Sequence, residues 1–126
     1  MKQKRTAFFV SDRTGLTVEK LGRSLLSQFE GIEFHRVTLP FVDSVEKARA
    51  AKERIDQTAH ADGQRPIVFS TLIVPEIHDI LEDCEALVID LFESFIVPLE
   101  NELGIPSSHA IGRSHHPGMY YNERMD

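Results

Sequence analysis

The chain has 126 residues, a length that fits one domain with a sizeable hydrophobic core. Its hydrophobic fraction of 41% and charged fraction of 27% are those of a folded protein and exclude global disorder. The net charge of −6 argues against a nucleic-acid partner, which needs a basic face, and no apolar run approaches the roughly 20 residues that span a bilayer. We therefore expect neither nucleic acid nor a membrane as a partner.

Short, β-rich apolar runs alternate with helical patterns along the chain. The runs cover residues 6–10, 33–39, 66–70 and 86–89. This alternation is typical of βαβ units. We predict an α/β fold of three layers, in which a mainly parallel four-stranded sheet lies between flanking helices and a polar C-terminal arm follows.

The first predicted helix follows Gly15 and ends at Gly31. Thr14 or Thr17 is placed to cap its N-terminus. An apolar stripe at helical spacing defines this helix and consists of Val18, Leu21, Leu25, Leu26 and Phe29.

The second and third predicted helices also carry start signals. Residues 43–46 have a D-x-x-E pattern close to a capping box, and Asp62-Gly63 ends this helix. Pro75 suits the first position of the third helix. The apolar positions are Val45, Ala48, Ala51, Ile55 and Ala59 in the second helix, and Ile77, Ile80 and Leu81 in the third.

A fourth helical pattern closes at Gly104 and is made of Phe92, Phe95, Ile96, Leu99 and Leu103. Pro98 interrupts it, and proline inside a helix costs about 3 kcal/mol. We therefore expect a kink there or a helix that begins near Pro98. We assign residues 1–104 to an α/β domain and 105–126 to a polar arm with the start of a helix, and we expect the chain to be part of a longer protein.

Cys84 is the only cysteine, so the chain cannot form an internal disulfide. The apolar stretch 7–10 behind the basic N-terminus is too short for a signal peptide. Both observations fit a reducing cytoplasm, where we expect the protein to be. Cys84 itself is expected to be a small buried apolar side chain.

Polar side chains gather where the predicted strands end, and ligands of parallel α/β sheets bind at that edge. The four ends supply Ser11, Asp12, Thr14 and Gly15, then Thr38 and Pro40, then Ser70 and Thr71, and finally Asp90 and Glu93. The hydroxyls can donate to phosphate oxygens, and a strand–turn–helix layout aims free backbone N–H groups and the helix dipole at an anion. The sequence predicts an anion site here.

Other interpretations of this edge stay open. Hydroxyls at strand ends commonly cap helices and turns, and Asp12 fits a general base, a metal ligand or a simple cap. No stretch matches G-x-x-x-x-G-K-[ST] or G-x-G-x-x-G, so the nucleotide-binding patterns are missing.

The polar arm carries the other reactive side chains. Arg113 can hold a phosphate bidentately, and His109, His115 and His116 can move protons near neutral pH. No acidic or cysteine partner stands at a familiar metal spacing, so no metal site is expected there. The remaining histidines, His35, His60 and His78, receive no role.

Five stretches in order resemble the phosphoenolpyruvate synthase regulatory proteins, which are related to the regulators of pyruvate, phosphate dikinase. They are FFVSDRTGLT at 8–17, LGRSLLSQF at 21–29, RVTLPF at 36–41, IVFSTL at 67–72, and 107–115 with SSH at its start and GRSH at its end. The likeness covers nearly the whole chain, and the ordered set is specific.

The resemblance implies a bifunctional serine/threonine kinase and phosphorylase. Such an enzyme uses ADP to phosphorylate a threonine of phosphoenolpyruvate synthase and inorganic phosphate to remove that group, releasing pyrophosphate. It carries a P-loop in a C-terminal region, where we expect the ADP site, so this stretch alone should be inactive and bind no cofactor itself. A homo-oligomer stays open.

The strand ends, the polar arm and the resemblance together give the candidate site residues. Those expected to bind phosphate or another ligand are Ser11, Arg13, Thr14, Gly15, Ser70, Thr71, Arg113 and Ser114, with His109 contacting the target or the phosphate. Asp12 and His115 are the candidates for acid–base work. The family pattern has glycine where this chain has Arg13, which would be strained if the turn needs a positive φ; alternatively Arg13 adds charge to the anion site.

The alternative function is a non-catalytic α/β module that binds an anion or a protein, similar to a receiver domain. Receivers need a phospho-acceptor Asp after the third strand and a late Lys. Here the third strand ends in Ser70-Thr71 and no lysine follows Lys52. This makes the receiver a poor match, while an unphosphorylated interaction module stays open.

Overall fold

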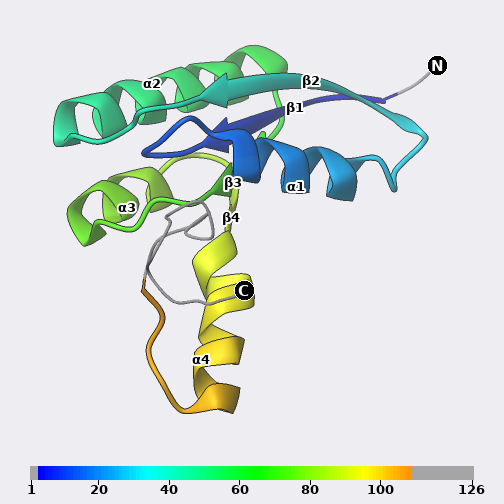
Figure 1. Cartoon of the computed structure of the whole chain (residues 1–126). Helices are drawn as coiled ribbons and strands as arrows, with labels where there is room; N and C mark the ends of the chain where they lie inside the picture. Colours follow the sequence, from blue (N-terminus) through cyan, green and yellow to red (C-terminus); the bar gives the residue numbers. More distant parts are fainter. Residues whose placement is uncertain (1–2, 109–126) are drawn as a thin grey trace.

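The computed structural model describes residues 3–108, which form a four-stranded sheet with helices on both sides (Figure 1). The strands are β1 (Gln3–Val10), β2 (Ile32–Leu39), β3 (Ile67–Ser70) and β4 (Leu87–Asp90). Between them run α1 (Leu16–Leu26), α2 (Val45–Asp62) and α3 (Pro75–Glu82). A π-helical turn, Phe92–Ile96, and α4 (Val97–Leu103) follow β4.

All strands are parallel, in the order β2-β1-β3-β4. The predicted parallel α/β sheet is confirmed. The register pairs Val10 with Leu39 and with Ser70, and Ser70 with Asp90. The carboxyl ends of all four strands are therefore level at one edge of the sheet.

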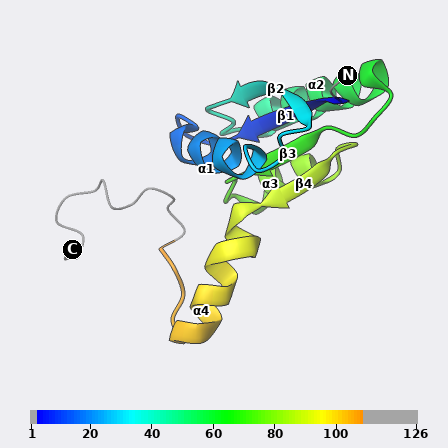
Figure 2. The same ribbon diagram turned by 90° about the vertical axis from the view of Figure 1, so that its right-hand side faces the viewer.

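Two separate cores make the three layers. Phe8 and Val10 of β1 pack against α2 and α3 on one face of the sheet, whereas Ala7 and Phe9 pack against α1 on the other. Figure 2 shows α1 on one side of the strands, with α2 and α3 behind them. Successive residues of a strand point to opposite faces, which is why a run that is apolar throughout suits a sheet covered on both sides.

The α1 helix differs from its predicted stripe. It ends at Leu26, so Phe29 lies beyond it and is 58% exposed, and Leu25 is exposed as well. The buried positions are Val18, Gly22 and Leu26. Gly22 is part of the packed face because its missing side chain makes room for Phe9.

The ends of α1 also differ from expectation. Gly15, not Thr14 or Thr17, is the N-cap, and no side chain caps this terminus. The Thr14 hydroxyl instead accepts a 3.4 Å hydrogen bond from the N–H of Leu16, the first residue of α1. An N-cap side chain accepts from the second or third helical residue, so this bond does not cap the helix. The C-cap is Ser27 rather than Gly31.

The α2 and α3 helices confirm most of their predicted positions. Ala48, Ala51 and Ile55 are buried in α2, and Ile77 and Leu81 are buried in α3. The α2 cap is Ser44, whose hydroxyl accepts from the Lys47 N–H at 3.2 Å. Asp43 does not cap the helix but forms an ion pair with the Lys47 ammonium.

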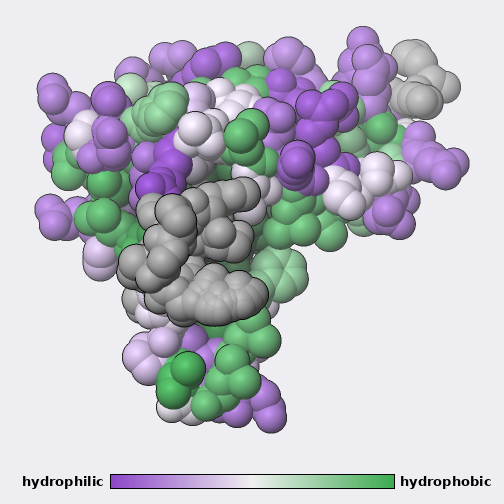
Figure 3. All heavy atoms as spheres, viewed as in Figure 1, coloured by the Kyte–Doolittle hydropathy of each residue, from purple (hydrophilic) through white to green (hydrophobic). Residues whose placement is uncertain are grey.

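Pro98 stands in the first turn of α4, as one of the two alternatives expected, and Gly104 ends this helix. Phe92 and Ile96 are half-buried, but the other apolar side chains of the segment stay largely exposed. Phe95, Leu99 and Leu103 are 46%, 54% and 65% exposed, because α4 leads away from the sheet (Figures 1 and 2). Figure 3 shows the resulting hydrophobic spheres at the lower end of the view, over α4.

Cys84 is buried, as predicted, and burial raises the pKa of its thiol to about 11. A thiol with such a pKa stays protonated and unreactive near neutral pH. Within residues 3–108, no helix has both the length and the apolar composition that a membrane crossing requires.

Asp56 joins α2 to the segment before β4 and supplies a test of acid stability. Its carboxylate pairs with the Lys52 ammonium at 2.7 Å and accepts from the Glu85 N–H at 2.7 Å. Burial alone would raise the pKa of Asp56, but the hydrogen bonds from Lys52 and Glu85 outweigh it, and the pKa is lowered.

We expect Asp56→Asn to cost about 1 kcal/mol of unfolding free energy at neutral pH, since the charge-assisted part of these bonds is lost. A carboxyl with a depressed folded-state pKa stabilises the fold above its unfolded pKa of about 3.9 and loses that contribution as the pH falls through the folded value. Urea unfolding at pH 7 and pH 3 checks this, and a difference between the two proteins that survives undiminished at pH 3 would contradict it.

Candidate functional site

The neighbouring strands β1 and β3 end side by side, and the helices that follow them lie on opposite faces of the sheet. The Thr71 N–H donates to the Val10 carbonyl oxygen at 3.1 Å, which holds the two strand ends together. From β1 the chain turns into α1 on one face, and from β3 into α3 on the other. A crevice at such a switch point is where parallel α/β sheets bind ligands.

The turn after β1, residues 11–15, is held by its own hydrogen bonds. Ser11 is buried, and its hydroxyl accepts from the Arg13 N–H at 3.0 Å. Gly15 has φ 87°, and a Cβ at this position would lie 3.0 Å from the Thr38 methyl carbon. Glycine is needed here both for the left-handed backbone and for the close approach to β2.

The segment after β2 supports this turn from the side. The Phe41 N–H donates to the Arg13 carbonyl oxygen and the Val42 N–H to the Ser11 carbonyl oxygen, both at 2.8 Å. Phe41 itself has φ 58°, a conformation that costs a non-glycine residue energy. The turn is thus attached to two strands rather than to one.

The backbone of Arg13 does not have the strain that a positive φ would cause. Among the described residues, Phe41 is the only non-glycine residue with a positive φ. The left-handed position of the turn is Gly15, so an arginine fits at position 13. Its side chain is exposed, so the other alternative, a positive charge added to a site at this edge, stays a prediction.

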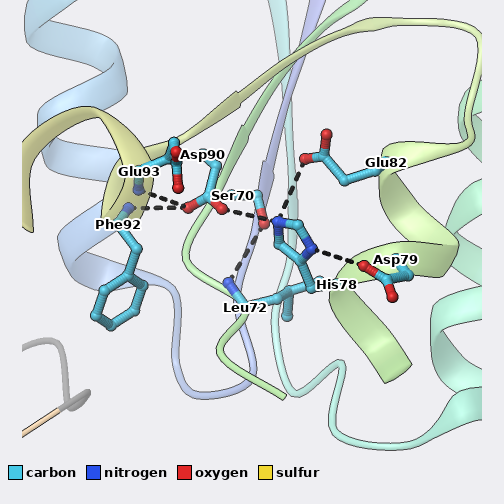
Figure 4. Close-up of polar contacts among 8 residues, drawn as sticks. All are labelled: Ser70, Leu72, His78, Asp79, Glu82, Asp90, Phe92 and Glu93. Carbon is cyan, nitrogen blue, oxygen red and sulfur yellow. Dashed lines mark hydrogen bonds and ion pairs between the residues drawn. The ribbon is translucent and has the colours of Figure 1, made fainter. Parts of the chain in front are cut away.

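The turn after β3 brings two more hydroxyls to this edge of the sheet. Ser70 and Thr71 are 1% and 3% exposed. The Ser70 hydroxyl accepts from the Leu72 N–H at 3.3 Å, as Figure 4 shows. Ser11 and Ser70 therefore both serve their turns, as the structural interpretation expected, while each retains an O–H to donate. The Thr71 hydroxyl forms no hydrogen bond with any residue of 3–108.

Asp12 lies half-buried at the same edge. Burial raises the pKa of its carboxyl, and the negative charge of Asp43 adds to this, while the Asp12 N–H and the Arg13 guanidinium act in the opposite direction. The net effect is a pKa above the ordinary value. A carboxylate with a raised pKa is a better proton acceptor near neutral pH than an ordinary one.

The edge extends to β4 through a group that the sequence analysis missed. The His78 Nε2 atom lies 2.8 Å from an Asp90 oxygen and 3.5 Å from a Glu82 oxygen. Burial alone would lower the pKa of His78, but hydrogen bonds and charges from Asp79, Asp90 and Glu82 raise it. His78 and Glu82 stand four residues apart in the predicted third helix, a usable signal, but only the packing of α3 beside β4 brings them to Asp90.

The other predicted positions have different outcomes. Thr38 donates its hydroxyl proton to a Glu19 carboxylate oxygen at 2.6 Å, which ties β2 to α1. Thr14 is exposed on the turn, and Glu93 is exposed after β4. Four predicted arm residues, His109, Arg113, Ser114 and His115, lie outside the described residues. The structure brings the groups on strand ends to one edge, and their contact with a ligand remains a prediction.

The sequence matches a family profile described as kinase/pyrophosphorylase over residues 7–126. Two similar proteins carry the name "Putative phosphoenolpyruvate synthase regulatory protein". The one from Ectopseudomonas mendocina (strain ymp) is 49% identical over 125 residues, which cover 98% of this chain and 46% of the relative. The one from Alcanivorax borkumensis is 56% identical over 112 residues, which cover 89% of this chain and 41% of the relative. The chain thus spans less than half the length of these relatives.

Proposed function

The chain belongs to the kinase/pyrophosphorylase family, and we propose that it is the N-terminal part of a bifunctional regulator of phosphoenolpyruvate synthase. This regulator uses ADP to phosphorylate a threonine of the synthase, which inactivates it, and uses inorganic phosphate to remove the group. The names of the relatives support the target. The observation that carries the role of this part is the meeting of the turns after β1 and β3 at a switch point.

Both proposed reactions move a phosphoryl group between oxygen atoms. In the kinase direction, the threonine oxygen bonds to the β-phosphorus of ADP, the bond to the α-phosphate oxygen breaks, AMP leaves and a base takes the hydroxyl proton. In the dephosphorylation, a phosphate oxygen bonds to the phosphothreonine phosphorus, the threonine oxygen leaves with a proton, and pyrophosphate is released. Each step needs donors for anionic oxygens and one group that exchanges a proton.

The carboxyl edge of the sheet supplies groups suited to both needs. The backbone N–H groups of Thr17 and Val18, which no side chain caps, the Thr71 hydroxyl and the Arg13 guanidinium are donors for phosphate oxygens. Asp12, with its raised pKa, is the described candidate for holding the proton. We propose that ADP binds in the C-terminal region typical of the family and that the whole protein works in the cytoplasm.

A thermal-shift experiment tests the anion site. We expect pyrophosphate, and more weakly phosphate, to raise the unfolding midpoint of this chain by roughly 5–10 °C at 100 times Kd, since such a ligand adds about 2.7 kcal/mol to stability. ADP alone should give no comparable rise. Thr71→Val should weaken pyrophosphate binding about 10- to 100-fold, the loss expected for a hydrogen bond to a charged group.

Thr58→Val is the matched control, because Thr58 lies on α2 and its hydroxyl donates to the Arg54 carbonyl oxygen in the same helix. It should bind pyrophosphate as the unaltered chain does. Flat curves with phosphate and pyrophosphate would overturn the anion site and leave the non-catalytic, protein-binding module as the function of this part of the chain.

A further inference from the structure

A cluster of one histidine and two carboxylates lies at the end of β4. We propose that His78, Glu82 and Asp90 bind a divalent transition-metal ion, with Zn²⁺ as the ion that fits best. His78 and Glu82 project from one side of α3, and Asp90 is the last residue of β4 (Figure 4). The proposal concerns side chains that the phosphoryl-transfer proposal does not use, so either can fail without the other.

The three side chains lie close enough together to bind the same ion. The Nε2 atom of His78 and one oxygen each of Glu82 and Asp90 all lie within 4.8 Å of one another. Zinc binds nitrogen and carboxylate oxygen at about 2.0–2.2 Å, so ligand atoms around one tetrahedral ion stand about 3.3–3.6 Å apart. The observed separations from Nε2, 2.8 Å to Asp90 and 3.5 Å to Glu82, need shifts of less than about 1 Å to reach that geometry.

Neighbouring groups orient two of the three ligands. The other ring nitrogen of His78, Nδ1, lies 3.3 Å from an Asp79 carboxylate oxygen, to which an Nδ1–H can donate when Nε2 binds a metal. The second Asp90 oxygen, Oδ1, accepts from the Phe92 N–H at 2.8 Å and from the Glu93 N–H at 3.4 Å. Asp90 therefore presents Oδ2 toward His78, as Figure 4 shows.

The exposure of the three ligands allows an ion to enter. The side chains of Asp90 and His78 are 15% and 28% exposed, whereas that of Glu82 is 42% exposed. Glu82 can thus move aside on the solvent-facing side while the other two remain in place. Three protein ligands leave a fourth position for water or an oxygen of another ligand, which is the arrangement of zinc sites that keep an open position.

The types of ligand atom in the cluster favour Zn²⁺ over the hard cations Mg²⁺ and Ca²⁺. Imidazole nitrogen suits Zn²⁺ and other later transition metals, while Mg²⁺ and Ca²⁺ prefer oxygen ligands alone and need six or more. Two carboxylates also balance the charge of a divalent ion. Without an ion, the hydrogen bonds and ion pairs of His78 with its neighbouring carboxylates account for the same cluster, and this is the competing outcome of the test.

Zinc titration of the metal-free 126-residue chain, followed by calorimetry, tests the site. We expect one Zn²⁺ per chain, no displacement by millimolar Mg²⁺, and visible d–d absorption of a four-coordinate ion when Co²⁺ replaces zinc. His78→Gln and Asp90→Asn should each weaken zinc binding at least 10- to 100-fold, the range already seen for lost outer-shell partners. Glu82→Gln, on the exposed side, should weaken it with the smallest risk to folding.

His60→Gln is the matched control. His60 also faces a carboxylate, Glu85, at 3.7 Å, but among the described residues it belongs to no group of three side chains that could hold a metal ion. This variant should bind zinc as the unaltered chain does. Circular dichroism of each metal-free variant shows whether the fold is kept.

Absence of zinc binding to the unaltered chain would overturn the proposal and leave the contacts of His78 with its carboxylates as the explanation of the cluster. Equal binding by Glu82→Gln and the unaltered chain, together with equal binding by a folded His78→Gln, would also overturn it. In that case the ion lies elsewhere on the chain.

Discussion

Phe9→Ala is expected to lower the free energy of unfolding by about 3–5 kcal/mol, because it empties the space of a fully buried ring. Phe9 lies on the α1 face of β1, and its ring stacks on that of Phe69 with centroids 5.8 Å apart. The substitution removes the ring stacking together with the buried surface. Phe9→Leu keeps most of the volume and should cost less than Phe9→Ala.

Urea unfolding followed by circular dichroism measures this effect, since the chain contains no tryptophan for fluorescence. Phe29→Ala is the control with the same change of side chain at an exposed position. We expect it to alter the unfolding free energy by less than about 0.5 kcal/mol. Equal losses for the two variants would mean that α1 continues to Phe29 and packs it on the sheet, as the apolar periodicity alone indicated.

Gly22→Ala is expected to destabilise the fold by about 2 kcal/mol, although alanine favours a helix by about 1 kcal/mol over glycine. A Cβ on Gly22 would lie 2.3 Å from one ring carbon of Phe9 and 3.1 Å from one of Phe69. Neither ring can swing away, because both are buried and stacked on each other. The α1 helix must therefore move off the sheet.

Gly31→Ala is the matched control for this glycine. A Cβ there would meet nothing within 4 Å, and the backbone of Gly31 is not in the left-handed region. It should be neutral within about 0.5 kcal/mol. Urea unfolding measures the change that Gly22→Ala makes in the free energy of unfolding. An increase would contradict the prediction and show that α1 and β1 lie farther apart than described.

Gly22→Ala also bears on the candidate site. The α1 helix starts at the turn of residues 11–15, and the Glu19 N–H donates to the Gly15 carbonyl oxygen at 2.9 Å. Displacing the helix displaces the N–H groups that follow Gly15. Pyrophosphate binding by this variant should therefore weaken together with its stability, whereas Gly31→Ala should leave both unchanged.

The strand ends could be predicted from the sequence because each depends on neighbouring residues. Within the runs predicted at 6–10 and 66–70, residues 7–10 and 66–69 are apolar throughout, which a strand covered on both faces requires, and the following Ser11 and Ser70 mark the turns. Parallel strands then bring these ends to one edge without further information. For this reason the predicted approach of the turn at 11–15 to Ser70 and Thr71 is confirmed, at the level of the backbone, by the bond from the Thr71 N–H to Val10.

The predictions that failed depend on contacts between distant elements. The predicted stripe of α1 included Phe29 and left out Gly22. Hydrophobic periodicity is read from apolar side chains, so it cannot show that a glycine is buried because a ring of β1 occupies the space beside it. The cap of α1 was sought among hydroxyl side chains, whereas the chain enters this helix through a left-handed glycine close to Thr38.

The sequence by itself determined the elements, the parallel sheet and the family, because hydrophobic period, turn residues and ordered motifs are local properties of a chain. Only the tertiary structure decided which side chains meet across elements: Phe9 with Gly22, and His78 with Asp90. The physical reason is that His78 and Asp90 belong to separate elements, α3 and β4, whose relative position follows from packing on a shared core. No spacing along the chain encodes that distance.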